Sequence, residues 1–401
     1  MVDDGVFSWH PDARLFAGAE VVSPKAAGGT GFLEIGVKET HSALAQIADA
    51  VQTERPFCAC ETHLPPDVSA PEGAFLTLSG GSSGAPKTML RSQRSWTRTF
   101  EVNVALFELK PGRGVAVLGR ISHSLALYGV LEGLHLGLRV HALDGLRPST
   151  QRRLIADHEI SMIYATPMQL RLLAKRAKPA ALPGVSLILC GGGALDEGTR
   201  SAVRKLCPGA DIRVFYGAAE TSFITLSDAQ TPAGSVGRAY PGVEIEVDAG
   251  EVWVRSRYLF DRYVSGAAGD TRWKDGFLSV GELGRMDAQG QLFITGRKGR
   301  MVSVADQLVS PEAVEAFVSK QLGGRACAVL SPLDAVRGRS LVLVLEGPRD
   351  DDLAAEMRRA CKAALGAAAT PRRVAFHPRL PLLASGKTDL AKLERWWEGG
   401  T

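Results

Sequence analysis

The sequence has little of what marks several other classes of protein. No apolar run is long enough to cross a membrane, and no positively charged start leads into an apolar stretch as in an export signal, so we expect a cytoplasmic protein. The net charge is only +4 over 401 residues, and no basic stretch is concentrated enough to indicate nucleic acid as a partner.

Cysteine is also scarce, with six residues and no Cys-x-x-Cys pair. This pattern favours reduced, structural thiols over a disulfide framework. Cys58, Cys60 and His63 lie close in sequence, but a fourth ligand at a suitable spacing is missing, which argues against a zinc site. Hydrophobic residues make up 45% of the chain, which is enough for a large core and for more than one domain.

The sequence does contain an unusual run of small residues, Ser-Gly-Gly-Ser-Ser-Gly-Ala-Pro-Lys, at positions 79–87. Backbone N–H groups, hydroxyls and a lysine in one loop suit a nucleotide polyphosphate. It is not a Walker loop, because Ala85 and Pro86 separate the last glycine from the lysine. Taken alone, the run also fits a flexible linker. The candidate phosphate-binding residues are Ser79, Gly81, Ser82, Ser83, Gly84 and Lys87.

Four further motifs follow this run in a fixed order. They are Tyr-Gly-Ala-Ala-Glu-Thr at 216–221, Ser-Val-Gly-Arg-Ala-Tyr-Pro-Gly at 235–242, Gly-Glu-Leu-Gly at 281–284 with Gly-Arg at 296–297, and Leu-Pro with Ser-Gly-Lys at 380–387. Their order and spacing resemble those of the adenylate-forming (AMP-binding) superfamily, which includes acyl- and aryl-CoA synthetases, adenylation domains and luciferases. The resemblance extends from about residue 73 to residue 392.

The resemblance implies an enzyme that joins ATP to a carboxylic acid, releasing pyrophosphate and forming acyl-AMP. Lys87 and the loop at 79–84 would hold the β- and γ-phosphates, and Glu220 would hold Mg²⁺, which prefers a few carboxylates together with phosphate oxygens. Lys387 would be the catalytic cation between the carboxylate and the α-phosphate, where charge develops in the transition state. The alternative for Glu220 is a solvated loop residue.

The same resemblance implies a nucleoside site. Glu282 stands where the family usually has aspartate and would accept from the ribose hydroxyls, with Arg297 as a second sugar contact. Gly192 and Gly193, in the glycine-rich segment 190–194, would let adenine lie against the main chain, although a tight strand-to-helix turn fits the same residues.

The resemblance to this superfamily also implies residues that lie beside the reacting groups. Tyr216, Gly217 and Thr221 would complete the nucleotide site. His123 resembles the family's aromatic or histidine gate beside the acyl pocket and is the fourth candidate catalytic residue, after Lys387, Glu220 and Lys87; a core histidine is the alternative.

Apolar periodicity predicts an α/β protein with largely parallel strands. The predicted strands are 114–118, 138–143, 162–165 and 341–345. The predicted helices are 124–136, 151–158, 167–177 and 311–322. Short alternation at 251–255 and 291–295 indicates a β-rich subdomain. We expect a large N-terminal domain over residues 1–298, shortened at its start, and a small mobile α+β lid domain over 299–401 that carries the catalytic lysine.

Three departures concern the second half-reaction. Gly299 stands where the family's hinge usually has aspartate or lysine, and Ser303 and Asp306 replace a lysine and a glycine that are common in CoA-forming relatives. CoA is the favoured thiol acceptor, with the phosphopantetheine of a carrier protein as the alternative.

The short N-terminal part is similar to aryl-acid ligases of the coumarate or dihydroxybenzoate type, which favours an aryl or cinnamic acid as substrate. The alternatives are loading of an aryl acid onto a carrier protein, as in siderophore assembly, activation of a medium-chain fatty acid, a luciferase-like oxidation, and a non-catalytic nucleotide-binding module.

Overall fold

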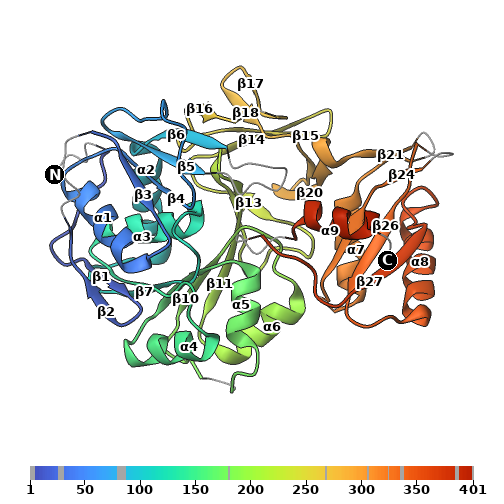
Figure 1. The fold of residues 1–401 in the computed structure, drawn as a ribbon, viewed down its shortest axis with the longest axis horizontal. Coiled ribbons are helices and arrows are strands. Elements are labelled where there is room, and N and C mark those ends of the chain that lie inside the picture. The colour runs from blue at the N-terminus through green and yellow to red at the C-terminus, as the bar shows by residue number, and fades with distance from the viewer. Residues whose placement is uncertain are drawn as a thin grey trace.

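The structure is a computed structural model that describes residues 5–25, 31–78, 87–178, 181–266, 269–304, 307–323, 325–334, 338–383 and 388–399. Figure 1 shows a larger part, coloured blue to yellow, and a smaller orange-to-red part beside it. Both parts contain helices packed on sheets, so the predicted α/β class is confirmed.

The main sheet begins with parallel strands that are joined by helices. Strands β7, β9 and β10 are buried along their whole length, and β8 is buried after Arg139, as expected when helices cover both faces of a parallel sheet. Helices α3 to α6 make the connections. The bounds are β7 (Gly114–Val117), α3 (Ser124–Leu136), β8 (Arg139–Ala142), α4 (Pro148–Asp157), β9 (Met162–Ala165), α5 (Pro167–Ala174), β10 (Leu187–Cys190) and α6 (Glu197–Leu206). The strands and helices predicted between residues 114 and 177 are therefore confirmed, with ends that differ by a few residues.

The same sheet continues through antiparallel strands. Its order runs β8-β7-β9-β10-β11-β12-β13-β20-β19-β15-β18-β17, with β14 paired to β15, and β1 and β2 extend the edge at β8. This antiparallel half contains the β-rich region predicted around 251–255 and 291–295. The expectation of largely parallel strands therefore holds for the region from β7 to β10 but is wrong for the sheet as a whole, because short strands joined by turns pair antiparallel. The bounds are β1 (Arg14–Ala17), β2 (Glu20–Val22), β11 (Asp211–Ala218), β12 (Ser222–Leu226), β13 (Gly237–Ala239), β14 (Glu244–Asp248), β15 (Glu251–Arg255), β17 (Arg272–Lys274), β18 (Phe277–Ser279), β19 (Glu282–Met286) and β20 (Gln291–Arg297).

A second sheet has the order β16-β6-β5-β4-β3. Helix α1 contacts both this sheet and the β1–β2 edge of the main sheet, while α2 packs on α3 and β6, so a helical layer separates the two sheets. The bounds are β3 (Leu33–Gly36), α1 (Thr40–Gln52), β4 (Phe57–Cys60), β5 (Ala74–Leu78), β6 (Thr88–Ser92), α2 (Arg94–Phe107) and β16 (Arg262–Ser265).

One carboxylate, Glu132 on α3, is fully buried in this helical layer. Its Oε2 accepts a hydrogen bond from the Tyr164 hydroxyl (2.5 Å), and its Oε1 accepts from Asn103 Nδ2 (2.7 Å) and from the Tyr128 hydroxyl (3.3 Å). Burial raises the pKa of Glu132 to about 7, although these hydrogen bonds act in the opposite direction. Neutral donors therefore surround a carboxyl group that is partly protonated near neutral pH.

The smaller part follows the 3-10 turn at Lys298–Arg300 and has an apolar core of its own. Helix α7 begins with Ser310 as N-cap, whose hydroxyl accepts from the Ala313 N–H (3.1 Å), and Pro311 occupies its first turn. The bounds are β21 (Val302–Val304), β22 (Gln307–Val309), α7 (Pro311–Gln321), β23 (Cys327–Leu330), β24 (Leu333–Asp334), β25 (Gly338–Arg339), β26 (Val342–Glu346), α8 (Asp351–Leu365), β27 (Arg373–His377) and α9 (Leu390–Glu398).

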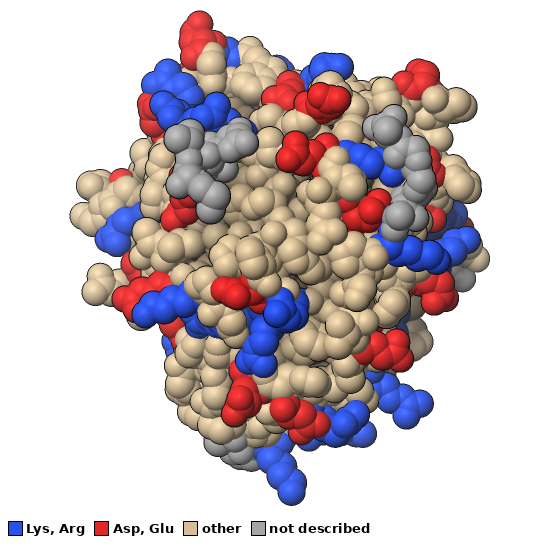
Figure 2. All heavy atoms as spheres, turned by 90° about the vertical axis from the view of Figure 1, so that its left-hand side faces the viewer, with Lys and Arg blue, Asp and Glu red and all other residues tan. Residues whose placement is uncertain are grey.

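The surface carries charges of both signs. Figure 2 shows one face of the larger part, where blue and red residues alternate around an uncharged centre and form no continuous patch of one sign. Within the described residues, every helix is too short or too polar to span a bilayer.

Candidate active site

The predicted phosphate loop connects β5 to β6, and we call the region around Lys87 the phosphate end of the candidate site. These strands pair antiparallel with Leu78 opposite Thr88, so Leu78 and Lys87, which flank the predicted phosphate loop, lie at the same end of this strand pair. Lys87 lies directly before β6, and its ammonium nitrogen is 5.0 Å from the centroid of the Tyr263 ring. The other predicted phosphate-loop residues, Ser79, Gly81, Ser82, Ser83 and Gly84, lie outside the described residues.

Glu220 lies in the turn between β11 and β12. Its Oε1 accepts a hydrogen bond from the Tyr263 hydroxyl (2.7 Å), which also lies 2.8 Å from Thr271 Oγ1. Within the described residues, Oε2 of Glu220 makes no hydrogen bond or ion pair. Through Tyr263, the structure therefore brings Glu220 and Lys87 to the same place.

A fully buried arginine, Arg91 on β6, holds the backbone around Glu220. Its guanidinium donates to the carbonyl oxygen of Ala219 (2.6 Å), to the Ser222 hydroxyl and to the Tyr258 carbonyl oxygen. Burial lowers the pKa of Arg91 to about 10, opposed by the nearby carboxylates of Asp261 and Glu220. Arg91 thus fixes the turn through main-chain oxygens rather than through the Glu220 side chain.

Two other residues of the motif at 216–221, Thr221 and Gly217, shape the turn that carries Glu220. Oγ1 of Thr221 accepts from the Ala218 N–H (2.9 Å) and closes the turn. At Gly217, a β-carbon would lie 1.8 Å from the carbonyl oxygen of Ser222, so only glycine fits there. This close approach coincides with a β-bulge between Tyr216 and Gly217.

The two residues predicted to bind ribose, Glu282 and Arg297, lie on the paired strands β19 and β20. Arg297 donates from Nε (2.6 Å) and Nη2 (2.5 Å) to Oε1 of Glu282, whose side chain is only 5% exposed. Burial, followed by the Glu282 carboxylate, raises the pKa of Tyr216 well above its usual value. Tyr216 therefore lies near the pair, and β11 leads from it to the turn that carries Glu220.

The glycine-rich segment after β10 also lies at a strand end. Gly192 has a φ of +83°, which favours glycine, and its position and that of Gly193 leave room for a β-carbon. At Gly191 a β-carbon would instead lie 2.2 Å from the Phe215 ring, so packing against β11 requires glycine there. His123 precedes α3, and its backbone bridges to Leu78, the last residue before the phosphate loop.

The segment after β20 connects the two parts of the molecule. Lys298 Nζ donates to Oε2 of Glu251 (2.7 Å), and the Oε1 of this carboxylate accepts from the Ser279 hydroxyl (2.6 Å) and from Arg272. The Glu251 side chain is only 6% exposed. Burial alone would raise its pKa, but the hydrogen bonds from Lys298, Ser279 and Arg272 hold the pKa of Glu251 below its usual value.

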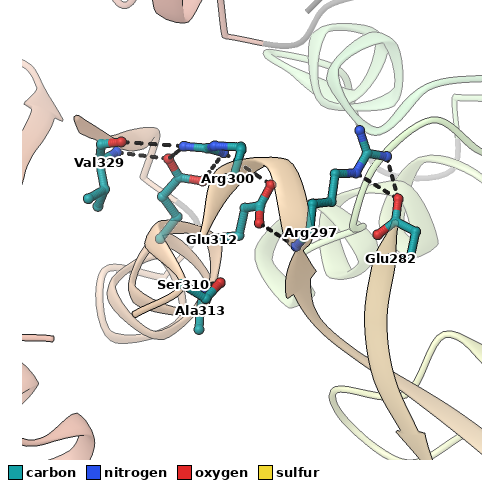
Figure 3. A network of polar contacts seen from close by, with 8 residues as sticks. Glu282, Arg297, Arg300, Ser310, Glu312, Ala313 and Val329 are labelled. Carbon is teal, nitrogen blue, oxygen red and sulfur yellow. Dashed lines mark hydrogen bonds and ion pairs between the residues drawn. The ribbon is translucent and has the colours of Figure 1, made fainter. Parts of the chain in front are cut away.

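Arg297 and Arg300, which flank Gly299 in the sequence, contact helix α7 of the smaller part (Figure 3). Arg300 pairs with Glu312 (3.4 Å) and Glu315 (3.1 Å) of α7, and Glu312 Oε2 accepts from the backbone N–H of Arg297 (3.0 Å). Burial raises the pKa of Glu312, opposed by Arg300. A β-carbon at Gly299 would lie 2.5 Å from Oδ2 of Asp270, so a larger residue there would require the Asp270 side chain to move.

Three predicted positions lie in the smaller part, and the structure describes one of them. Ser303 lies on β21, opposite Leu308 of β22. Asp306 and the candidate catalytic lysine, Lys387, lie outside the described residues.

Comparisons with known proteins agree on the kind of protein. The AMP-binding enzyme family model matches residues 22–264, which is more than half of the chain, and the model for the AMP-binding enzyme C-terminal domain matches residues 313–387. The chain belongs to the AMP-binding enzyme family. The resemblance of its five motifs to the adenylate-forming superfamily is thereby confirmed, and its class is that of the AMP-forming acid–thiol ligases.

Individual relatives of this AMP-binding enzyme are distant. It is 27% identical over 347 residues to the uncharacterized acyl-CoA ligase YhfT of Bacillus subtilis (strain 168), covering 83% of this chain and 70% of the relative. It is 26% identical over 334 residues to the 2-succinylbenzoate-CoA ligase of Listeria monocytogenes serotype 4b (strain F2365), covering 80% and 69%. The solved O-succinylbenzoate coenzyme A synthetase (MenE) of Bacillus subtilis, in complex with ATP and magnesium ion, shares the fold with a TM-score of 0.70 at 21% identity, covering 91% and 79%.

Two residues of the site in this AMP-binding enzyme, Arg91 and Tyr263, were not predicted from the sequence. Both act on the turn that carries Glu220, which lies 43 residues before Tyr263. Their partners are brought close by the antiparallel pairing of β16 with β6, in which Tyr263 lies opposite Met89. No local pattern in the sequence marks either residue, because each contact depends on the fold.

Proposed function

We propose that this enzyme activates a carboxylic acid with ATP, forming acyl-AMP and pyrophosphate, and then transfers the acyl group to the thiol of CoA. One observation carries the proposal: residues from three separate motifs converge, with Lys87 and Glu220 joined through Tyr263, and the Glu282–Arg297 pair beside Tyr216 on the strand that leads to Glu220. Similarity to CoA ligases supports the same reaction.

The phosphate end supplies positive charge where ATP would carry its negative charge. Lys87 and the loop residues Ser79, Gly81, Ser82, Ser83 and Gly84 would bind the β- and γ-phosphates and stabilise the leaving pyrophosphate. Gly266 and Gly269 support this role for Lys87, since β-carbons there would lie 2.9 Å from its Cγ and 3.2 Å from its Nζ. The lysine stem is therefore packed, which limits the positions that its ammonium group can reach.

Magnesium fits this end of the site. Mg²⁺ needs only one or two carboxylates when phosphate oxygens and water complete its octahedron, and Glu220 offers Oε2 while Tyr263 occupies Oε1. In the described part of the chain no group of three or more carboxylate, histidine or cysteine side chains could hold a metal alone, which agrees with a metal that arrives with the nucleotide. Bound there, Mg²⁺ would neutralise charge on the phosphates.

At the nucleoside end, Glu282 would accept from the ribose hydroxyls, and Arg297, whose side chain is 42% exposed, would make the second sugar contact. Adenine would lie on the main chain at Gly192 and Gly193, with Tyr216, Gly217 and Thr221 shaping the neighbouring wall. Since Thr221 and Gly217 also shape the turn itself, their contribution would be mainly to position Glu220.

Catalysis would need the smaller part of the molecule. We propose that residues 299–401 form the lid domain and that residues 1–298 form the N-terminal domain, because the residues after the turn at Lys298–Arg300 pack into a separate apolar core. Lys387 would bridge the attacking carboxylate and the α-phosphate. His123, next to the start of the phosphate loop, would border the acyl pocket.

An aryl or cinnamic acid is the proposed substrate, with 4-coumarate as a test compound, and a medium-chain fatty acid is the alternative. The relative named for 2-succinylbenzoate supports an acid with an aromatic ring. CoA is the proposed acceptor, and the phosphopantetheine of a carrier protein is the alternative. We place the enzyme in the cytoplasm, because the cysteines at 58, 60, 190, 207, 327 and 361 are all free thiols.

Acid-dependent exchange of labelled pyrophosphate into ATP tests the adenylation step. A panel of aryl, cinnamic and fatty acids should give exchange with one acid class, and Lys387→Ala should reduce the exchange rate by a factor of about 100 or more. Lys392→Ala, at an exposed lysine of α9, is the matched control and should leave the rate unchanged.

Thioester formation needs a separate measurement. With the active acid, consumption of CoA thiol and formation of acyl-CoA are compared with loading of a phosphopantetheinylated carrier protein. Exchange without acyl-CoA would assign the carrier protein as acceptor. ATP binding without exchange for any acid would favour the non-catalytic nucleotide-binding module.

A further inference from the structure

Tyr263 lies between the side chains of two residues that come from different motifs. Its hydroxyl donates to Oε1 of Glu220 (2.7 Å), and the ammonium group of Lys87 lies 5.0 Å from its ring centroid. The pairing of β16 with β6 fixes this position, because Tyr263 lies opposite Met89, two residues after Lys87. One half-buried side chain therefore contacts both polar groups of the phosphate end.

The hydrogen bonds at the Tyr263 hydroxyl have a defined direction. A phenol has one proton to donate, and an ionised carboxylate can only accept, so this proton points to Glu220. The contact with Thr271 Oγ1 (2.8 Å) must then be one in which Thr271 donates to the tyrosine oxygen. The relay Thr271 to Tyr263 to Glu220 orients the carboxylate with Oε1 engaged, while Oε2 makes no hydrogen bond or ion pair among the described residues.

The ring of Tyr263 has a second task. A cation near an aromatic face is attracted by the ring quadrupole, and the attraction remains when the hydroxyl is removed. Phenylalanine at this position would therefore keep the contact with Lys87 and lose only the hydrogen bond to Glu220. The two tasks can be separated by substitution.

We propose that Tyr263 is a positioning residue for the phosphate end, which orients Glu220 through its hydroxyl and Lys87 through its ring. The inference rests on the proposed function, in which Glu220 holds Mg²⁺ and Lys87 binds phosphate. It assigns Tyr263 no contact with the reacting atoms, so its removal should change metal and ATP affinity more than the rate at saturation.

The test is calorimetric titration of the full-length protein with ATP at several Mg²⁺ concentrations, together with pyrophosphate exchange. We expect Tyr263→Phe to raise the Mg²⁺ concentration for half-maximal ATP binding about tenfold, since one charge-assisted hydrogen bond is lost. Its ATP affinity without Mg²⁺ should stay at the wild-type value. Tyr263→Leu should weaken ATP binding both with and without Mg²⁺, and Thr271→Val should shift the Mg²⁺ dependence about threefold.

Tyr258→Phe is the matched control. This tyrosine lies in the same stretch of chain, and its hydroxyl donates to the carbonyl oxygen of Pro241 (2.8 Å), away from the phosphate end. It should leave the Mg²⁺ dependence unchanged. Urea midpoints of all variants show whether each protein is folded.

Two results would overturn the inference. One is a Tyr263→Phe protein with the wild-type Mg²⁺ dependence of ATP binding; the other is an equal loss of binding with and without Mg²⁺, which would assign a purely structural role. Absence of exchange in the wild type with every acid, while ATP still binds in a Mg²⁺-dependent manner, would instead reject the proposed reaction and leave the role of Tyr263 to the binding data.

Discussion

Two buried glutamates, Glu132 in the helical layer and Glu251 beside the turn at Lys298–Arg300, hold their carboxylates in opposite ways. Glu132 receives hydrogen bonds from two tyrosines and an asparagine, which are neutral, and burial raises its pKa to about 7. Glu251 receives them from Lys298, Arg272 and Ser279, and its pKa is lowered. The opposite directions of the two pKa shifts follow from the deeper burial of Glu132 together with the positive charge of two of the donors to Glu251.

The opposite pKa shifts of Glu132 and Glu251 agree with where each residue lies in the molecule. Glu132 lies in the interior of the helical layer, and its neutral donors satisfy the carboxyl group without burying a cation beside it. Glu251 anchors the residue next to Gly299, where the two parts of the molecule meet. The cations that neutralise Glu251 remain partly exposed to water, with Lys298 42% exposed, whereas the donors to Glu132 lie in the interior.

The largest expected effect is that of Glu251→Gln. The change leaves Lys298 and Arg272 side by side without their carboxylate and should lower the free energy of unfolding by about 2–4 kcal/mol, as measured by urea denaturation. Glu244→Gln, which breaks the exposed pair with Arg255, is the control and should have little effect. Equal losses in the two variants would contradict the importance of burial at Glu251.

The next effect is a pH dependence carried by Glu132. Its folded pKa is raised above the unfolded value, so its favourable contribution is full below about pH 4.5 and is lost as the pH rises through about 7, on the order of 3 kcal/mol in all. Glu251 has the opposite sign, because its lowered pKa gives stability that is present above about pH 4.5 and lost in acid. Unfolding free energies between pH 5 and 8 should fall for the wild type, and Glu132→Gln should flatten this slope; an unchanged slope would show that Glu132 ionises normally.

A smaller effect follows from Tyr164→Phe. The change removes the 2.5 Å hydrogen bond to Glu132 and should cost about 1–2 kcal/mol. It should also steepen the loss of stability towards pH 8, since the ionised carboxylate loses a donor. Tyr240→Phe removes a bond to Asn103 (2.7 Å), one step further from the carboxylate, and should alter the pH slope less.

The smallest effect is expected for Lys298→Met. Arg272 and Ser279 would still bind Glu251, and the lysine side chain is already 42% exposed, so the loss should be about 1 kcal/mol or less in urea denaturation. A loss as large as that of Glu251→Gln would mean that Lys298 alone neutralises the carboxylate. The two carboxylates would then differ less than their contacts indicate.

The region in which strands and helices alternate was predicted from the sequence. The apolar runs at 114–118 and 162–165 and the periodic segment at 124–136 are strands and a helix in the structure, because parallel strands with covered faces leave a strong local pattern. The order of the small antiparallel strands was not predicted. Strands such as β13 (Gly237–Ala239) and β17 (Arg272–Lys274) are only three residues long, too short for a clear local pattern, and β13 pairs with a distant strand, β20.

The candidate site divides in the same way. Lys87, Glu220, Glu282 and Arg297 were identified because motif spacing marks them. Tyr263 was not, because its partners meet only after β16 pairs with β6. The contact between Glu251 and Arg272 was not predicted for the same reason. In the sequence, each is a single charged residue in a short strand, which is typical of an exposed position.

Gly217 has a consequence for how this lineage would change over time. Its β-carbon position is occupied by the carbonyl oxygen of Ser222, so the glycine is required by the backbone whether or not ATP is ever bound. If a descendant of this chain lost its activity, drift would erase Glu220 and Lys87 first and spare Gly217. A glycine at position 217 would then indicate only that the backbone fold had been kept. The presence of Glu220 and Lys87 would indicate whether the activity had been kept.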